Sequence, residues 1–331
     1  MNYYNILKKK ISDRSAKICV IGLGYVGLPL LKSFANKGFN TIGLDKDKKK
    51  SKIVNKIKNS IFSTNYNVTQ SADVIIITLP TPLKINKTPD LSHIISCARK
   101  LKKNIKKGQL ISLESTTYPG TTESFILPMI NQNGYKVSKE FFLVYSSERV
   151  SPELKTKKKI IKFHLTNTPK VCGGYSRNCL KLGENLYKNI TTKIIKAKDL
   201  KSAEASKMLE NVYRSVNIAL VNELKMFFKK INIDISHVIE LASTKPFGFT
   251  KFLPGPGFGG HCIPIDPFYL YWLGKKNGFN LKFVKSSGEI NEKITSWIVQ
   301  QMVNFFKRNK IKIPSKKILI LGIAYKKDID D

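Results

Sequence analysis

One cysteine lies in a stretch whose composition sets it apart from the rest of the chain. Between Leu253 and Leu270, two prolines and four glycines closely precede Cys262. Such a stretch forms no regular helix or strand, and its backbone can lie directly against a ligand. A cysteine thiolate adds to an aldehyde and can then hold the acyl group as a thioester. We therefore predict that Cys262 is a nucleophile and that Asp266 steers a water or a proton; the alternative is an unreactive cysteine in a turn.

A second glycine-rich stretch has the spacing of a dinucleotide-binding turn. The motif GxGxxG follows the apolar run 17–21 and precedes a helical pattern over 28–36. Its residues are Gly22, Leu23, Gly24, Tyr25, Val26 and Gly27. The first glycine permits a tight turn, the second lets a pyrophosphate approach, and the third lets helix and strand pack closely. The start of the helix then binds the pyrophosphate through its N–H groups.

Asp45 follows a second predicted strand at 39–44. A carboxylate at this position binds the adenosine ribose hydroxyls and repels a 2′-phosphate, which favours NAD over NADP. The alternatives are that Asp45 is a turn residue, or that the lysines at 46 and 48–50 accept the phosphate of NADP.

Three further apolar runs, at 72–78, 109–113 and 141–145, read as buried parallel strands. Each is followed by polar residues, and ligands in such sheets bind beyond the carboxyl ends of the strands. A last strand at 171–174 is expected to close the sheet. The pattern predicts an α/β fold: a Rossmann-type doubly wound parallel sheet followed by a mainly helical domain.

Residues 201–229 have apolar side chains at helical spacing, with no internal glycine or proline. A helix of this length can join two domains or form a dimer interface. Four polar residues share one of its faces: Glu204, Lys207, Asn211 and Arg214. They are either functional groups or the solvated side of an amphipathic helix.

Composition excludes several other classes. The five cysteines have neither CxxC spacing nor histidine partners at metal-ligand spacing, so we expect no metal site and no disulfides, and a reducing, cytoplasmic setting. No apolar run reaches the roughly 18 residues of a membrane span, and the first ten residues do not resemble a signal peptide.

The formal net charge of +35 would suit a nucleic-acid partner. However, only six of the 58 basic residues are arginine, the side chain that makes bidentate base contacts. We therefore expect no specific nucleic-acid binding, although the charge helps to attract a polyanionic substrate or cofactor.

Taken together and in order, the motifs resemble those of the UDP-glucose/GDP-mannose dehydrogenases, which are four-electron nucleotide-sugar 6-dehydrogenases. The matching segments are 22–27, 80–82, 115–116, 147–149, 204–211, 221–223, 254–267 and 321–326. Thr244 to Phe249, together with His261 before the cysteine, is most similar to the UDP-N-acetylglucosamine 6-dehydrogenase branch of polysaccharide synthesis.

The resemblance implies that C6 of a UDP-sugar gives one hydride to NAD⁺, that the cysteine captures the aldehyde, and that a second hydride and hydrolysis yield the uronate. The implied catalytic residues are Cys262, Lys207, Asn211, Asp266, Glu148 and Thr116. The lysine and asparagine would bind the C6 oxygen, and the glutamate would act as general base on a water positioned by the threonine. The implied cofactor contacts are Gly22, Gly24, Tyr25, Val26, Gly27, Asp45, Thr81, Pro82, Ser115 and Thr116. The implied substrate contacts are Glu148, Arg149, Lys207, Asn211, Arg214, Phe252, Gly255 and Gly259.

The resemblance also implies a domain order: an NAD-binding domain at 1–198, a central domain carrying the cysteine and the homodimer contact at 199–312, and the start of a UDP-binding domain at 313–331. Two features depart from the family. Ser147 replaces the usual proline before the catalytic glutamate, and the chain ends where the third domain begins, with its first strand and turn predicted at 315–323. We therefore expect a truncated chain.

Three alternatives stay open. One is a dehydrogenase of the same family acting on UDP-glucose or GDP-mannose. Another is a two-electron β-hydroxyacid dehydrogenase of similar layout, which has no use for Cys262. The last is an inactive remnant that binds NAD or a nucleotide sugar.

Overall fold

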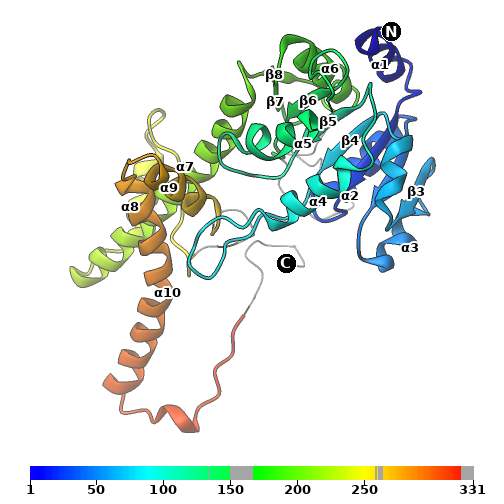
Figure 1. Ribbon diagram of the computed structural model, residues 1–331. Coiled ribbons are helices and arrows are strands. Elements are labelled where there is room, and N and C mark those ends of the chain that lie inside the picture. The colour runs from blue at the N-terminus through cyan, green and yellow to red at the C-terminus, as the bar shows by residue number, and fades with distance from the viewer. Residues whose placement is uncertain (133, 150–166, 258, 260–263, 322–331) are drawn as a thin grey trace. The chain divides into compact units, whose positions relative to one another are not determined.

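The computed structural model describes residues 1–331 except 133, 150–166, 258, 260–263 and 322–331. The chain forms two compact units (Figure 1). The first comprises residues 1–84 and 89–207, and the second comprises residues 85–88 and 208–331. Each is described by itself below.

The first unit is built on one eight-stranded sheet in the order β3-β2-β1-β4-β5-β6-β7-β8. Its strands are β1 (Lys17–Ile21), β2 (Asn40–Leu44), β3 (Ser60–Ser63), β4 (Val74–Ile77), β5 (Leu110–Leu113), β6 (Phe142–Tyr145), β7 (Lys170–Gly174) and β8 (Ile194–Lys196). All neighbours are parallel except β6 and β7, which are antiparallel with Tyr145 opposite Gly173. The predicted α/β doubly wound sheet is confirmed.

The sheet is wider than the sequence predicted. The strand at 171–174 does not close it, because β8 pairs beyond β7, and β3 adds a further edge beyond β2. Both edge strands are short and partly exposed, and β3 is half serine. Neither therefore has the continuous apolar run by which a buried parallel strand is recognised.

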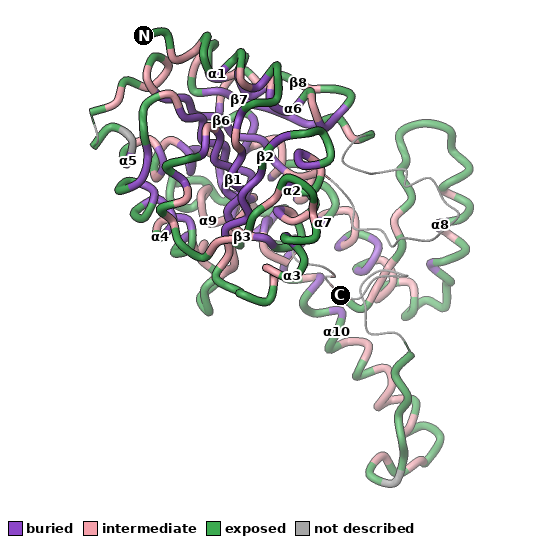
Figure 2. Tube along the Cα trace, turned by 90° about the vertical axis from the view of Figure 1, so that its right-hand side faces the viewer, coloured by how far each residue is buried: buried purple, intermediate pink, exposed green. Residues whose placement is uncertain are grey.

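Both faces of the central strands are buried, which explains their mainly apolar sequences (Figure 2). On one face, Ile18 and Val20 of β1 and Val74 and Ile76 of β4 join a core cluster with residues of α1, α2 and α6. The helices of this unit are α1 (Tyr3–Ser12), α2 (Gly27–Asn36), α3 (Ser51–Val54), α4 (Ser92–Lys102), α5 (Leu127–Asn131) and α6 (Arg177–Tyr187), with short turns η1 (Lys48–Lys50), η2 (Tyr66–Ser71) and the π-helical η3 (Thr122–Ile126).

The long helix predicted at 201–229 is confirmed as α7 (Leu200–Lys230). Its first two turns belong to the first unit and the rest to the second. The second unit also contains α8 (Ile235–Ser243), α9 (Asp266–Lys276), α10 (Lys282–Arg308) and η4 (Ile313–Ser315). Its small apolar cluster joins Val221 of α7 to Ile235 and Ile239 of α8.

The strand predicted at 315–323 is not present in the described part of that range. Residues 316–321 form no strand, and Ile318 to Leu321 are exposed. The described residues of the second unit contain no other strand with which the backbone groups of a strand at this position could pair. Over the described residues, no helix is both long and apolar enough to cross a membrane.

Candidate active site

The glycine-rich turn after β1 has the geometry that its motif predicts. Gly22 has φ +90°, and a Cβ on Gly27 would lie 1.9 Å from the Gly22 carbonyl oxygen and 2.4 Å from Thr78 Oγ1. These two glycines are therefore required by the fold itself. A Cβ on Gly24, in contrast, would have no described heavy atom within 4 Å apart from those of its chain neighbours, which leaves its backbone accessible to a pyrophosphate.

Thr78 holds this turn in place, a role that the sequence analysis missed. Its hydroxyl donates to the Gly22 carbonyl oxygen at 2.6 Å. Helix α2 begins directly after the turn, and Val26 at its N-cap makes no side-chain capping hydrogen bond. The helix start is therefore a suitable anion-binding position.

Asp45 directly follows β2, beside the same turn. Its carboxylate accepts hydrogen bonds from the N–H groups of Leu23, at 2.7 Å, and Asp47, at 2.9 Å. Lys50 lies 3.6 Å from this carboxylate and donates to the Leu23 carbonyl oxygen at 2.6 Å. The glycine turn, the helix start and this carboxylate together fit NAD, and Lys50 is already bound to the turn rather than directed at a 2′-phosphate.

Hydrogen bonds join the segments that follow β4 and β5, as expected if both lie at the same edge of the sheet. Thr81 Oγ1 donates to the Thr116 carbonyl oxygen at 2.8 Å, and Ser115 Oγ donates to the Leu79 carbonyl oxygen at 2.7 Å. Pro82 accepts a backbone hydrogen bond from Asp90 at 2.9 Å. Four predicted site residues, Thr81, Pro82, Ser115 and Thr116, thus lie at one edge of the sheet.

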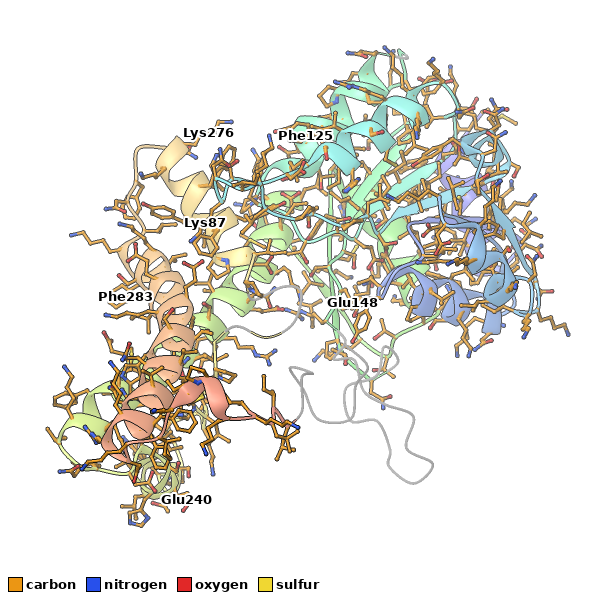
Figure 3. All side chains as sticks on the ribbon, turned by 90° about the horizontal axis from the view of Figure 1, so that it is seen from below. Lys87, Phe125, Glu148, Glu240, Lys276 and Phe283 are labelled. Carbon is orange, nitrogen blue, oxygen red and sulfur yellow. The ribbon has the colours of Figure 1, made fainter. Side chains whose placement is uncertain are left out.

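Glu148 follows β6 at the same edge and is half-buried (Figure 3). The Lys207 ammonium donates to its backbone carbonyl oxygen at 2.6 Å. The Arg149 N–H donates to Glu148 Oε1 at 2.6 Å, and Arg149 Nη1 donates to the Pro169 carbonyl oxygen at 3.3 Å. Helix α7 therefore brings Lys207 to the segment that contains the predicted general base.

Two buried charges lie beneath this segment, and the sequence analysis named neither as a site residue. Lys170 Nζ donates to Glu114 Oε2 at 2.6 Å and to the Ser147 carbonyl oxygen at 3.2 Å. The two side chains are 3% and 0% exposed. Burial raises the pKa of Glu114, and the Lys170 ammonium opposes that rise.

Glu204, on the polar face of α7, stabilises a neighbouring turn. Its buried carboxylate accepts hydrogen bonds from the Gly120 N–H and from the N–H and hydroxyl of Thr122. Burial raises the pKa of Glu204 to about 7, although these hydrogen bonds oppose the rise. Glu204 thus holds the turn that follows Ser115 and Thr116, one helical turn from Lys207.

In the second unit, Asn211 donates a side-chain hydrogen bond to Asp266 Oδ2. Asp266 is buried at the first position of α9. The structure therefore joins these two predicted catalytic residues. Cys262 lies outside the described residues, so its predicted role is not tested.

The predicted substrate contacts of the second unit lie on α7 and the segment before α9. Arg214 is exposed, and the Phe252 ring is half-buried with its centroid 6.0 Å from that of Tyr213. The Gly255 N–H donates to Asn222 Oδ1 at 3.0 Å, and Gly259 is half-buried. Among the described residues, no group of acidic, histidine or cysteine side chains could hold a metal ion.

Two sequence models of one family match the chain. The NAD binding domain of the UDP-glucose/GDP-mannose dehydrogenase family matches residues 16–64 and 51–191, and the central domain of that family matches residues 201–293. The first match spans β1 to β7 of the sheet, and the second runs from the start of α7 into α10.

Individual proteins are similar over nearly the whole chain. The UDP-N-acetyl-D-glucosamine 6-dehydrogenase of Pseudomonas aeruginosa is 32% identical over 96% of this chain and 77% of its own length. The UDP-N-acetyl-D-mannosamine dehydrogenase of Methanococcus maripaludis is 34% identical over 95% of this chain and 74% of its own. Among solved structures, the UDP-N-acetyl-mannosamine dehydrogenase Cap5O of Staphylococcus aureus has a TM-score of 0.81 and 31% identity, covering 96% of this chain and 76% of that one.

Proposed function

Because the chain belongs to the UDP-glucose/GDP-mannose dehydrogenase family, we propose that it oxidises the C6 alcohol of a UDP-N-acetylhexosamine to the carboxylate, with UDP-N-acetylglucosamine as the first candidate. The observation that carries this proposal is the match, over about 95% of the chain, to dehydrogenases of two UDP-N-acetylhexosamines. NAD is the cofactor of the family domain that matches the first unit. The product would supply surface-polysaccharide synthesis.

The reaction consumes one alcohol, two NAD⁺ and one water, and forms one carboxylate, two NADH and three protons. Bound NAD⁺ supplies the hydride acceptor for both oxidations. Cys262 adds to the aldehyde as a thiolate, and the second hydride leaves the resulting thiohemiacetal to form a thioester. Water then attacks the acyl carbon, the C–S bond breaks, and the thiol is regenerated.

The other residues act on oxygen and on protons. Lys207 and Asn211 bind the C6 oxygen, where a fixed cation and amide stabilise the developing negative charge. Asp266, which the Asn211 amide contacts, assists proton transfer near the cysteine.

Glu148 accepts a proton from the water of the hydrolytic step, and Thr116 positions that water. Arg149 and Arg214 contact the anionic substrate. Phe252, Gly255 and Gly259 contact the nucleotide sugar.

The long helix supports the proposal of a homodimer. Four large apolar side chains on one face of α7 are exposed: Leu209, Tyr213, Leu220 and Phe227. Burying this stripe against a second copy would remove it from water. Sedimentation equilibrium measures the mass directly, and a monomer at micromolar concentration would contradict this part of the proposal.

The test is the number of NADH molecules formed per sugar consumed, with UDP-N-acetylglucosamine, UDP-N-acetylgalactosamine, UDP-N-acetylmannosamine, UDP-glucose and GDP-mannose in turn. Two NADH per UDP-N-acetylhexosamine support the proposal, and Cys262→Ser should then abolish the second. One NADH per substrate molecule, obtained with a β-hydroxyacid, favours the two-electron alternative. No NADH from a protein that still binds NAD identifies a remnant.

A further inference from the structure

The buried pair of Lys170 and Glu114 lies where the carboxyl ends of β5 and β6 meet. These strands are parallel neighbours with Leu113 opposite Tyr145, and the Ser146 N–H donates to the Leu113 carbonyl oxygen at 3.0 Å. Glu114 is the residue after β5. The pair therefore involves the two strands whose following segments contain Thr116 and Glu148.

The reversal of one strand brings the lysine to this edge. Because β7 is antiparallel to β6, its first residue, Lys170, lies beyond the carboxyl end of β6. In a fully parallel sheet the first residue of β7 would lie at the opposite edge. Lys170 Nζ thus reaches both Glu114 Oε2, at 2.6 Å, and the Ser147 carbonyl oxygen, at 3.2 Å.

This arrangement connects the two hydrolytic residues through the main chain. Glu114 is two residues before Thr116, and Ser147 directly precedes Glu148. On its other side, the carbonyl group of Glu148 accepts the hydrogen bond from Lys207 at 2.6 Å. Two consecutive carbonyl groups, those of Ser147 and Glu148, are therefore each held by a lysine ammonium.

Stability alone is a poor reason for such a pair. Removing two charges from water is costly, and replacing a buried ion pair by apolar residues of similar volume is often neutral or stabilising. Ser147 Oγ beside it is buried without a hydrogen-bond partner among the described residues. The polar groups around the pair thus do not all form hydrogen bonds. This favours a role in holding the backbone in position over a role in stability.

We propose that Lys170 and Glu114 are positioning residues that set the distance between Glu148 and the water site at Thr116, and so control hydrolysis of the thioester. This inference rests on the proposed function, in which Glu148 is the base of that step. A general base acts only within hydrogen-bond reach of the water, so a displacement of about 1 Å at the Ser147 carbonyl is enough to slow the step.

The test compares Lys170→Met, Lys170→Arg and the double variant Glu114→Leu/Lys170→Met with the wild-type chain. The matched control is Lys107→Met. This change removes an exposed ion pair, between Lys107 and Glu140, that has the same 2.6 Å length and lies in the same unit. Rapid mixing with NAD⁺ and the nucleotide sugar separates the first burst of NADH from the later steady rate. Intact-protein mass spectrometry detects the sugar-acyl adduct.

Lys170→Met should keep the NADH burst, slow the steady rate about 10-fold or more, and accumulate the acyl adduct. Lys170→Arg should recover most of the rate, and Lys107→Met should match the wild type. The double variant should recover thermal stability while its hydrolysis stays slow. A folded Lys170→Met with normal hydrolysis, or a double variant that recovers both properties, would overturn the proposal.

A second readout does not depend on activity. Hydrogen exchange at the backbone amides of residues 146–149 should be faster in Lys170→Met and in the double variant, and unchanged in Lys107→Met. If the wild type forms no NADH, the proposed function fails, and the hydrogen-exchange result alone tests the positioning role. Unchanged exchange at residues 146–149 in both Lys170→Met and the double variant would overturn that role.

Discussion

Gly24 and Gly27 allow a prediction that separates cofactor binding from folding, because they belong to one turn but have different surroundings. A Cβ on Gly27 would lie 1.9 Å from the Gly22 carbonyl oxygen, whereas a Cβ on Gly24 would have no described heavy atom within 4 Å apart from those of its chain neighbours. Neither glycine has a positive φ. Replacement by alanine therefore tests the space around each residue rather than backbone strain.

Gly27→Ala should destabilise the first unit substantially. Relieving the contact requires the helix start and the strand end to separate by about 1 Å, and overpacking of this kind costs about 3 kcal/mol where backbone atoms collide. For a unit of this size, that cost corresponds to a fall in Tm of about 6–12 °C. NAD binding should be lost with it, because the turn itself is displaced.

Gly24→Ala should leave stability within about 1 kcal/mol of the wild type, since the added methyl group contacts no described residue beyond its chain neighbours. NAD affinity should nevertheless fall about 10-fold or more, equivalent to about 1.4 kcal/mol, because the methyl group takes the space of the pyrophosphate. Circular dichroism melts and isothermal titration with NAD measure the two effects. Wild-type NAD affinity in Gly24→Ala, or equal destabilisation by the two changes, would refute the reasoning.

Three further predictions concern single side chains. Burial raises the pKa of Glu204 from the ordinary glutamate value of 4.5 to about 7, so its contribution to stability is greatest below about pH 4.5 and is lost as the pH rises to about 7. Glu204→Gln should flatten this part of the stability curve in urea titrations from pH 5 to 8, and an identical slope would show that the carboxylate stays ionised. Asp45→Ala should weaken NAD binding by removing the ribose contact, whereas Asp47→Ala should not; equal affinities in a binding titration would mean that Asp45 is only a turn residue. Asn222→Ala should lower the free energy of unfolding in urea by about 1–3 kcal/mol, because it removes the buried acceptor of the Gly255 N–H. The control, Asn217→Ala on the same helix, should lower it by less than about 1 kcal/mol, and similar losses in the two variants would contradict the importance of the Asn222 contacts.

The sequence determined those features that depend on residues close together in the chain. Strands β4 and β6 are unbroken apolar runs and β1 and β5 are mainly apolar, α7 has one uninterrupted helical period, and the GxGxxG spacing between strand and helix specifies the cofactor turn. In each case the pattern reflects a local geometric requirement, such as burial on both faces or the lack of a Cβ. The family resemblance, supported by many motifs in order, is confirmed by the domain matches.

Only the tertiary structure decided which distant residues meet. Glu114 and Lys170 are 56 residues apart. Their contact depends on the antiparallel direction of β7, which no local sequence pattern predicts. Glu204 looked like one member of a polar helix face, but its carboxylate holds a turn 82 residues earlier in the chain. Edge strands β3 and β8 were likewise recognisable only from their partners, because hydrogen bonds to a neighbouring strand, rather than an apolar sequence, define a short exposed strand.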